Sequence, residues 1–248
     1  MLENQVKDVT LVLTSCNRPD DLEKTLTSIA SCDLGNVKRI IVVEDSENQE
    51  IEGIVSRCLR DVPYLFLQNE QNMGQIYSVD RAYAEVDTDY IYHCEDDWVF
   101  PSTLFIARSR VILDKHSNIH AVMVRAPEET PLSHYKLWDK VESGIEYWEF
   151  DPKAHRRYGS FSFNPGLRRT SDYLACAPFA NIGPEREICL QHKLSGFRLA
   201  HLKDGDVRHI GDDSATVKKD EIARKKSRGY LLQSASARIR FLLFRLFG

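Results

Sequence analysis

The sequence predicts an α/β protein in which helices cover both faces of a mostly parallel sheet. Three observations favour this fold class. Apolar runs rich in Val and Ile, typical of buried strands, alternate with segments whose apolar residues recur at helical spacing. Polar residues follow the ends of several of these strands, at the edge where open α/β sheets bind ligands. The chain of 248 residues is 42% hydrophobic and 28% charged, which is ordinary for a globular protein with a sizeable core.

The first strand is expected from Val9 to Thr14, where the residues are apolar or β-forming. The run breaks at the polar stretch Ser15-Cys16-Asn17-Arg18. Pro19 suits the first position of a helix, and the acidic residues after it suit the positive end of the helix dipole. An apolar stripe at helical spacing follows, formed by Leu22, Leu26, Ile29 and Ala30. The pattern therefore predicts a strand, a loop and a helix.

Three further strands are expected from Val37 to Val43, from Tyr64 to Leu67 and from Tyr90 onward, with helices between them. The second strand ends in Glu44-Asp45-Ser46, and the fourth ends in Glu95-Asp96-Asp97. Because the carboxyl ends of parallel strands meet at one edge of a sheet, we expect these acids to lie beside the loop after Thr14. Carboxylates at that place suit a divalent cation and the phosphate that it accompanies.

The second half of the chain is less regular. A strand is expected from His120 to Arg125, but Ala126 to about Thr170 shows no clean period and is rich in Trp, Tyr, Pro, His and Arg. A long irregular segment in a compact domain is more often a functional loop than filler. Beyond it, a short helix is expected from Pro184 to Ser195, and a short strand within Gly205 to Gly211 carries His209.

The net charge of −4 is unevenly distributed. From Val217 onward the chain has nine basic residues against two acidic ones, so this tail carries +7 and the rest −11. An acidic body argues against a nucleic-acid surface, and a basic tail favours an anionic partner. The apolar stretch from Ser234 to Phe247, interrupted by arginines, suits the surface of an anionic cytoplasmic leaflet. The alternative is a helix packed on the body or at a dimer interface.

The six cysteines are scattered without a Cys-x-x-Cys pair, which is typical of reduced thiols and not of a disulfide framework or a zinc site. The sequence shows no signal-peptide pattern and no stretch long and apolar enough to span a bilayer. We therefore expect a cytoplasmic protein, with peripheral contact to the cytoplasmic face of the membrane through the tail.

Taken in order, the motifs resemble family 2 glycosyltransferases of the GT-A fold. The resemblance rests on Thr14-Ser15-Cys16-Asn17-Arg18-Pro19, Val43-Glu44-Asp45-Ser46, Asn72-Met73-Gly74, Glu95-Asp96-Asp97 and Val207-Arg208-His209. It implies a Rossmann-like nucleotide-sugar-binding half over residues 1–125 and an irregular acceptor-binding and catalytic half of the same domain over residues 126–216. A basic amphipathic helical tail would cover residues 217–248.

The resemblance also implies which residues bind the donor. Thr14, Asn17 and Arg18 would line the nucleotide pocket, and Asp45 would hydrogen-bond the base, usually uracil. Asp96 would approach the ribose. From the residues alone, Asp45 could equally cap the following helix, as Asp often does.

The resemblance further implies a metal site and a catalytic base. Asp97 would ligate Mn²⁺ or Mg²⁺ on the diphosphate, and His209 would be a further metal or phosphate contact. Glu185 would deprotonate the acceptor hydroxyl, although acids at a helix N-terminus are favoured by the dipole whether or not they do chemistry. The family usually has Asp at Glu44, and usually Glu-Asp at Pro184-Glu185, so Glu187 is the reserve candidate for the base.

The implied function is the metal-dependent, inverting transfer of a sugar from a nucleoside diphosphate donor, usually a UDP-sugar, to a glycan or lipid-linked acceptor, as in polysaccharide biosynthesis. A sugar nucleotidyltransferase is an alternative, but it would want a glycine-rich loop after the first strand, and Ser15 to Asp21 has no glycine. A non-catalytic nucleotide- or glycan-binding module and a metal-dependent hydrolase are further alternatives. Arg168 and Arg169 could grip a phosphate, but surface arginines are common and neither is included in the predicted site.

Overall fold

The computed structural model describes residues 6–101, 105–130, 135–211 and 228–248, and within the last range it describes side chains from residue 235 onward. The main sheet has nine strands. In chain order they are β1 (Val9–Ser15), β2 (Val37–Glu44), β3 (Tyr64–Gln68), β4 (Tyr90–Glu95), β6 (Ile119–Met123), β7 (Leu137–Glu142), β8 (Ile145–Phe150), β9 (Gly166–Arg169) and β10 (Arg198–Leu202). A small second sheet pairs β5 (Trp98–Val99) with β11 (Arg208–His209).

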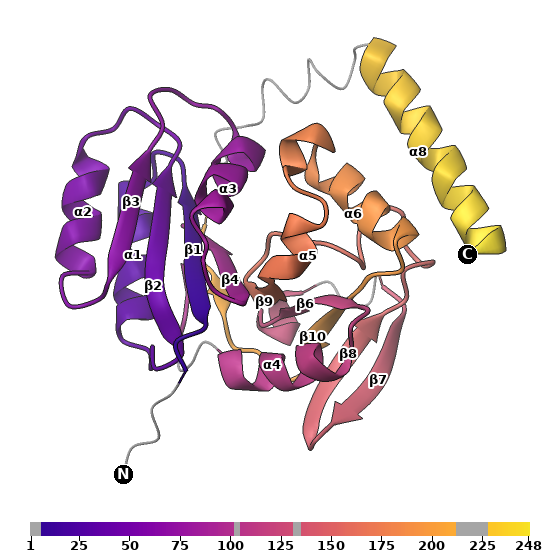
Figure 1. The fold of residues 1–248 in the computed structure, drawn as a ribbon, viewed down its shortest axis with the longest axis horizontal. Helices are drawn as coiled ribbons and strands as arrows, with labels where there is room; N and C mark the ends of the chain where they lie inside the picture. The colour runs from indigo at the N-terminus through magenta and orange to yellow at the C-terminus, as the bar shows by residue number, and fades with distance from the viewer. Residues whose placement is uncertain (1–5, 102–104, 131–134, 212–227) are drawn as a thin grey trace.

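Across the main sheet the strand order is β3-β2-β1-β4-β9-β6-β10-β8-β7 (Figure 1). The first four strands in this order are parallel, and β10 is parallel to β6. β9 runs antiparallel between β4 and β6, and β7 and β8 form an antiparallel hairpin at the far edge. The predicted α/β class is confirmed, and the sheet is mixed because its second half adds antiparallel strands.

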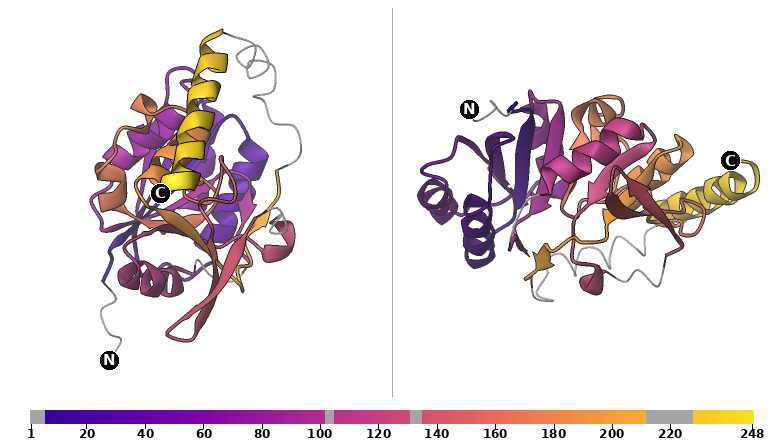
Figure 2. Two further views of the ribbon diagram at one scale, coloured as in Figure 1. Left: turned by 90° about the vertical axis from the view of Figure 1, so that its right-hand side faces the viewer. Right: turned by 90° about the horizontal axis from the view of Figure 1, so that it is seen from below.

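Helices cover both faces of the sheet (Figure 2). One apolar core lies between the sheet and the helices α1 (Pro19–Ala30), α2 (Glu50–Cys58) and α4 (Ile106–Lys115). A second core lies on the other face, beneath α3 (Gln75–Ala84), α5 (Thr170–Leu174) and α6 (Glu185–Leu194). The 3₁₀ turns η1 (Pro127–Glu129) and η3 (Phe179–Asn181) lie in the connections, and α8 (Arg228–Phe247) packs against α6.

The local sequence explains the central strands and the first helix. All seven residues of β1 are buried, as expected for a parallel strand covered on both faces, which is why its sequence is continuously apolar or β-forming. Helix α1 begins at Pro19, has Asp20 and Asp21 in its first turn, and buries Leu22 and Leu26 against the sheet. Proline at the first position and acids near the positive end of the dipole both favour this start.

The register of the central strands brings their polar ends together. Ser15 of β1 lies opposite Glu44 of β2, and Thr14 lies opposite Glu95 of β4. Glu44 lies opposite Gln68 of β3. The convergence that the sequence predicts at the carboxyl edge is therefore present in the fold.

The prediction that Ala126 to Thr170 lacks regular structure is wrong. This region contains η1, the β7–β8 hairpin and β9, which is inserted in the centre of the sheet. The hairpin turns at Ser143 and Gly144, which both have positive φ (50° and 80°), the geometry of a tight two-residue turn. Most of β7 is exposed or half-buried, so its sequence lacks the apolar alternation that signals a strand. The dipeptide Ser143-Gly144 is the feature of the sequence that could have predicted the turn of this hairpin.

Candidate functional site

The acidic turn after β4 is held in place by the first helix. The Thr25 hydroxyl of α1 donates to the backbone carbonyl of Asp96 (2.8 Å) and accepts from the backbone N–H of Trp98 (3.1 Å). Asp96 is 5% exposed and Asp97 8% exposed. A turn whose carboxylates are this buried is not a solvated surface turn, because charged groups are kept from water only where partners or a ligand compensate them.

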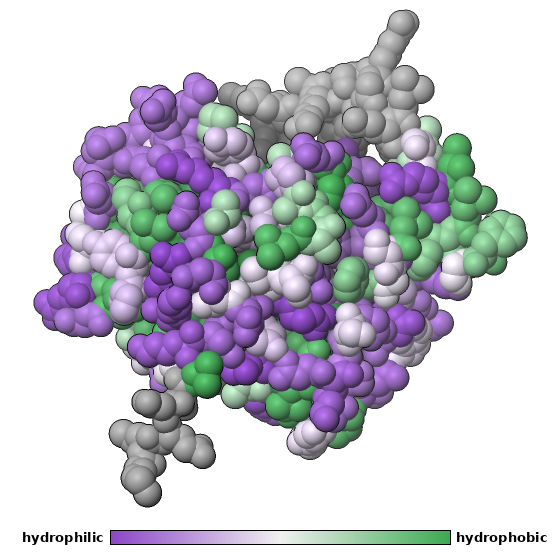
Figure 3. Space-filling view, viewed as in Figure 1, coloured by the Kyte–Doolittle hydropathy of each residue, from purple (hydrophilic) through white to green (hydrophobic). Residues whose placement is uncertain are grey.

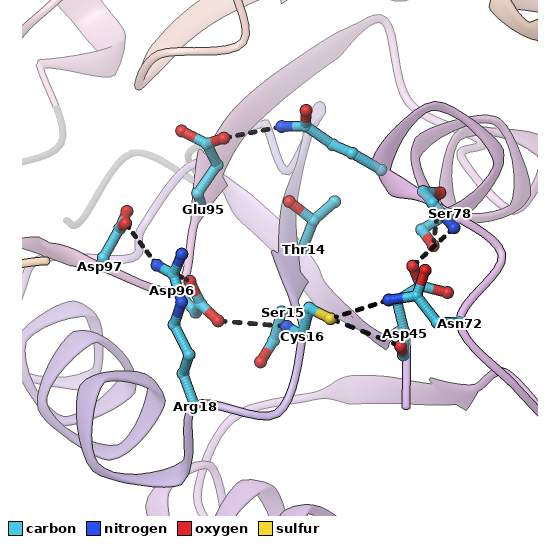
Figure 4. A pocket seen from close by; sticks show the side chains of 12 residues that line it. Thr14, Ser15, Cys16, Arg18, Asp45, Asn72, Ser78, Glu95, Asp96 and Asp97 are labelled. Atoms are coloured by element: carbon cyan, nitrogen blue, oxygen red, sulfur yellow. Dashed lines mark hydrogen bonds and ion pairs between the residues drawn. The ribbon is translucent and has the colours of Figure 1, made fainter. Parts of the chain in front are cut away.

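A pocket of about 310 Å³ opens at this edge of the sheet (Figure 4). Its walls come from the ends of β1, β2 and β4 and from the start of α3. The residues that line it are Thr14, Ser15, Cys16, Arg18, Asp45, Asn72, Gly74, Gln75, Ser78, Glu95, Asp96 and Asp97. Four residues predicted for the donor site, Thr14, Arg18, Asp45 and Asp96, therefore share one cavity with Asp97.

Arg18 compensates the acids of the turn. Its Nη1 lies 2.6 Å from Oδ2 of Asp97 and 3.4 Å from Oδ1 of Asp96, so one guanidinium faces both carboxylates. The backbone N–H of Cys16 donates to Oδ2 of Asp96 (3.2 Å). The loop after β1 thus places a cation and an N–H donor directly over the acidic turn.

The carboxylates still repel one another. Burial, together with the charges of Asp97 and Glu185, raises the pKa of Glu95 to about 8. Burial also raises the pKa of Asp96 to about 6, although Arg18 opposes the shift. Glu95 accepts from the Gln75 amide (2.7 Å), which orients it into the pocket. Further positive charge at this place would relieve the crowding of acids.

Asp45 lines the pocket and also supports the loop before α3. Its Oδ1 accepts from the backbone N–H of Met73 and from the Asn69 amide, and its Oδ2 accepts from the N–H of Gly74, each at 2.7 Å. A carboxylate at these N–H groups, where α3 begins, is favoured by the helix dipole. The alternative that Asp45 caps the following helix is wrong, because the N-cap of α2 is Gln49 and Asp45 instead holds the start of α3.

Asn17 is the predicted donor residue that does not line the pocket. It is exposed, with a positive φ of 53°, and its side-chain oxygen accepts from Asn48 (3.0 Å). Its backbone N–H donates to the fully buried Glu44 (2.8 Å). Glu44, which stands where the resembled family usually has Asp, therefore fixes the loop that carries Arg18.

Glu185 is the first residue of α6. Its Oε1 accepts from the backbone N–H of Phe163 (3.1 Å), and the Ser162 hydroxyl is a further donor. Surrounding protein atoms raise the pKa of Glu185 by desolvation, although the residue as a whole is exposed. Its charge acts on Glu95, which places it near the site without lining the pocket. Glu187 instead pairs with Arg186 (3.5 Å).

Residues 10–168 match the family model described as glycosyl transferase family 2. The chain belongs to this family. It is therefore a glycosyltransferase that uses a nucleotide-sugar donor. None of the curated proteins is similar enough in sequence to match it.

Solved structures of other glycosyltransferases share the GT-A fold with this chain. One is the mannosyltransferase PcManGT from Pyrobaculum calidifontis, in complex with GDP-Man and Mn²⁺ (TM-score 0.65, 11% identity, covering 97% of this chain and 72% of the other). Another is TarS 1-349 of S. aureus with UDP-GlcNAc (TM-score 0.64, 13% identity, 86% and 61%). A third is GalNAc-T7 with UDP, GalNAc and Mn²⁺ (TM-score 0.67, 10% identity, 94% and 48%). At these identities the likeness establishes the fold.

The residues at the acidic turn of this glycosyltransferase fit a divalent cation. Nε2 of His209 lies 3.2 Å from Oδ2 of Asp97, and the buried Oδ1 of Asp97 has no hydrogen-bond partner. Within the described ranges, no three Asp, Glu, His or Cys side chains are arranged to hold a metal alone. A protein site with one or two ligands suits a cation that takes its remaining ligands from substrate phosphates and water.

Sequence reasoning missed part of the pocket wall. Ser78 lies one turn after Gly74 on α3 and reaches the pocket, and Asn72 donates to the Cys16 sulfur (3.2 Å). The sequence feature that could have predicted both residues is Gly74, which precedes an apolar stripe at helical spacing. A helix that starts at the carboxyl edge of the sheet presents its first turn to the ligand. Arg168 is not a phosphate contact, since it is fully buried and donates to the backbone carbonyl of Ser162 (2.9 Å).

Proposed function

We propose that this glycosyltransferase is a metal-dependent, inverting enzyme of the cytoplasm that transfers a sugar from a UDP-sugar to a glycan or lipid-linked acceptor. The observation that supports this most strongly is the buried acidic turn, in which Asp97 faces both Arg18 and His209 at the mouth of the pocket. The six free cysteines agree with a reducing compartment.

In this proposal the nucleoside lies across the carboxyl edge of the sheet. Thr14 and Asp45 bound the part of the pocket that would take the base, with Asn17 just outside it. Asp96 would approach the ribose, and it lies between the Cys16 N–H and Arg18. Asp97 and His209 would hold Mn²⁺ or Mg²⁺, which supplies positive charge to the diphosphate leaving group. The guanidinium of Arg18 can turn from Asp97 to a phosphate oxygen, since Arg pairs with both groups in the same geometry.

Glu185 is proposed to accept the proton of the acceptor hydroxyl as the new glycosidic bond forms. A general base must be unprotonated and within hydrogen-bond reach of the hydroxyl. The bonds from Phe163 and Ser162 fix the carboxylate at the start of α6, and its raised pKa makes it a stronger base than an ordinary glutamate. Inversion requires such a base on the face of the sugar opposite the leaving group. The assignment of Glu185 as the base and the assignment of an inverting mechanism therefore depend on each other.

The donor proposal is tested by titrating UDP, GDP and CDP calorimetrically into the protein with and without Mn²⁺. We expect Mn²⁺-dependent UDP binding that Asp97→Ala abolishes. Asp87→Ala is the matched control, because Asp87 is an exposed aspartate that pairs with Lys38 (2.7 Å) away from the pocket. Preference for another nucleotide would replace the uridine assignment, and equal binding by wild type and Asp97→Ala would contradict the metal role.

A further inference from the structure

Helix α8 docks on the body by one narrow face. Ala237 and Phe241 are buried and pack with Leu190 of α6, and Phe244 is partly buried beside them. The Lys193 ammonium of α6 lies 5.9 Å from the Phe241 ring centroid. Positions 237, 241 and 244 share one side of a helix. The docked face therefore accounts for less than half of the helix surface along this segment.

The opposite face of α8 is apolar and open to solvent. Leu242, Leu243 and Ile239 are 54%, 52% and 59% exposed, and Leu246 and Phe247 are 71% and 83% exposed. At 100° per residue these five side chains form one continuous stripe opposite Ala237. Figure 2 shows the helix on the outside of the molecule, and Figure 3 shows the apolar surface at its edge. An exposed apolar stripe of this size marks an interaction surface.

Arginines border this stripe on both sides. Arg238 and Arg245 lie along one edge at helical spacing, Arg240 lies along the other, and all three are exposed. Residues 235–248 contain no Asp or Glu. On the body, Arg156 lies close enough to Arg238 for their charges to interact: burial and the charges of Arg157, Arg238 and Arg186 lower the pKa of Arg156, and Glu187 opposes them. An apolar stripe edged by arginines matches the boundary between acyl chains and anionic headgroups, where long cationic side chains reach the phosphates.

We infer that the exposed face of α8 binds the surface of an anionic bilayer, with Leu242, Leu246 and Phe247 at the level of the acyl chains and the flanking arginines at the phosphates. A second copy of the chain fits this face less well, because pairing two such stripes would bring arginine edges together without an acid to offset them. This binding is to the bilayer surface, since none of the helices in the described ranges is long and apolar enough to cross a bilayer. The surface lies beside α6, the helix that begins at Glu185.

The inference is tested by co-sedimentation of the full chain with two kinds of vesicle. One kind is phosphatidylcholine alone, and the other also contains roughly 30 mol% of the anionic lipid phosphatidylglycerol, which attracts basic segments. We expect binding to the anionic vesicles only, and a fall of at least about tenfold in partitioning for Leu243→Glu and for the double variant Arg240→Gln, Arg245→Gln. Leu174→Glu on α5 is the matched control, since Leu174 is 66% exposed but lies outside this stripe, and it should bind as the wild type does.

Sedimentation equilibrium and thermal unfolding accompany each variant. Variants that keep the wild-type unfolding midpoint are folded, so lost vesicle binding is then a property of the surface and does not depend on the donor proposal. Vesicle binding that Leu243→Glu leaves intact would overturn the inference. A wild-type dimer that Leu243→Glu converts to a monomer, without vesicle binding in either, would assign the stripe to self-association and overturn it too.

Discussion

Nε2 of His209 lies 3.2 Å from Oδ2 of Asp97, although the two residues come from distant parts of the chain. The contact is built by backbone pairing. β11 pairs with β5 so that His209 lies opposite Trp98, and the N–H of Ile210 donates to the carbonyl of Asp97 (2.9 Å). The ring centroids of His209 and Trp98 are 4.9 Å apart, which restricts the imidazole further. A two-residue strand from the second half of the chain thus brings His209 to the acidic turn of the first half.

His209→Ala should weaken Mn²⁺-dependent UDP binding by about 10–100-fold, because an interaction with a charged group contributes about 1.5–3 kcal/mol. Binding of UDP without metal should change little. Calorimetry with and without Mn²⁺ separates the two effects. His116→Ala is the control, since His116 contacts Glu142 and Tyr147 instead. Equal losses with and without metal would argue for a phosphate contact in place of a metal ligand.

Gly211→Ala should disturb Asp97 without removing a ligand. A Cβ at Gly211 would lie 2.6 Å from Oδ2 and 2.9 Å from Cβ of Asp97, closer than real Cβ contacts, so Asp97 as a whole must shift. We expect Mn²⁺-dependent UDP affinity to fall by about tenfold, equivalent to about 1.4 kcal/mol. Gly53→Ala in α2 meets no atom within 4 Å and should keep full affinity. Its stability should rise by about 0.5–1 kcal/mol, as for alanine replacing glycine within a helix. Unchanged affinity in Gly211→Ala would contradict the placement of Asp97 as the ligand.

The sequence was sufficient for the parts of the site that follow directly from strand order. Val9–Ser15 and Tyr90–Glu95 are continuous buried strands, and parallel pairing forces their carboxyl ends to one edge. The positions of Thr14, Asp96 and Asp97 followed from that rule. The rule does not predict the direction of a loop side chain. Asn17 lies in the loop after β1, but its side chain contacts Asn48 and does not line the pocket.

The parts that sequence did not predict depend on tertiary contacts. Arg168 looks like a surface cation in sequence, yet it is fully buried in β9 and bonds the Ser162 carbonyl. Arg169 likewise donates to the carbonyl of Leu113 (2.6 Å). The β7–β8 hairpin was missed because its outer strand is solvated and carries little apolar periodicity. Burial of an arginine by backbone carbonyls leaves no pattern in the local sequence.

Asp45→Asn should affect both stability and base recognition. The amide nitrogen cannot accept from the N–H groups of Met73 and Gly74, so one part-buried donor loses its partner, at a cost of about 1 kcal/mol. Urea unfolding measures that loss. If Asp45 also binds the base, UDP affinity with Mn²⁺ should fall more than pyrophosphate affinity, since pyrophosphate has no base. Equal losses for both ligands would leave Asp45 only its role at the start of α3.

Acid should destabilise the fold through its buried histidines. Burial lowers the pKa of His192 to about 3 and that of His201 to about 4, whereas an unfolded chain protonates histidine near pH 6.5. The unfolded state therefore binds more protons at these histidines. The histidine contribution to the free energy of unfolding should be constant above about pH 7 and fall below pH 6.5, by up to about 1.4 kcal/mol per pH unit for each histidine. Glu95 contributes in the opposite sense, because its raised pKa of about 8 makes the folded state bind a proton that the unfolded state releases. Urea unfolding between pH 7.5 and pH 5 measures the slope, and His192→Leu should reduce it by about one proton. An identical slope in the variant would contradict the prediction.

Glu185→Gln should remove the catalytic base, and with it the fall in kcat at low pH. Because desolvation by surrounding protein atoms raises the pKa of Glu185 above that of an ordinary glutamate, the fraction of active enzyme should rise with pH through that higher pKa and level off above it. The variant should lose about 10²–10⁴-fold in kcat while keeping UDP affinity, since the group acts on the acceptor proton. Glu187→Gln, which removes the partner of Arg186, is the matched control and should keep both the rate and its fall at low pH. The reverse result would move the base to Glu187, and full activity in both variants would remove the general-base step and with it the assignment of inversion.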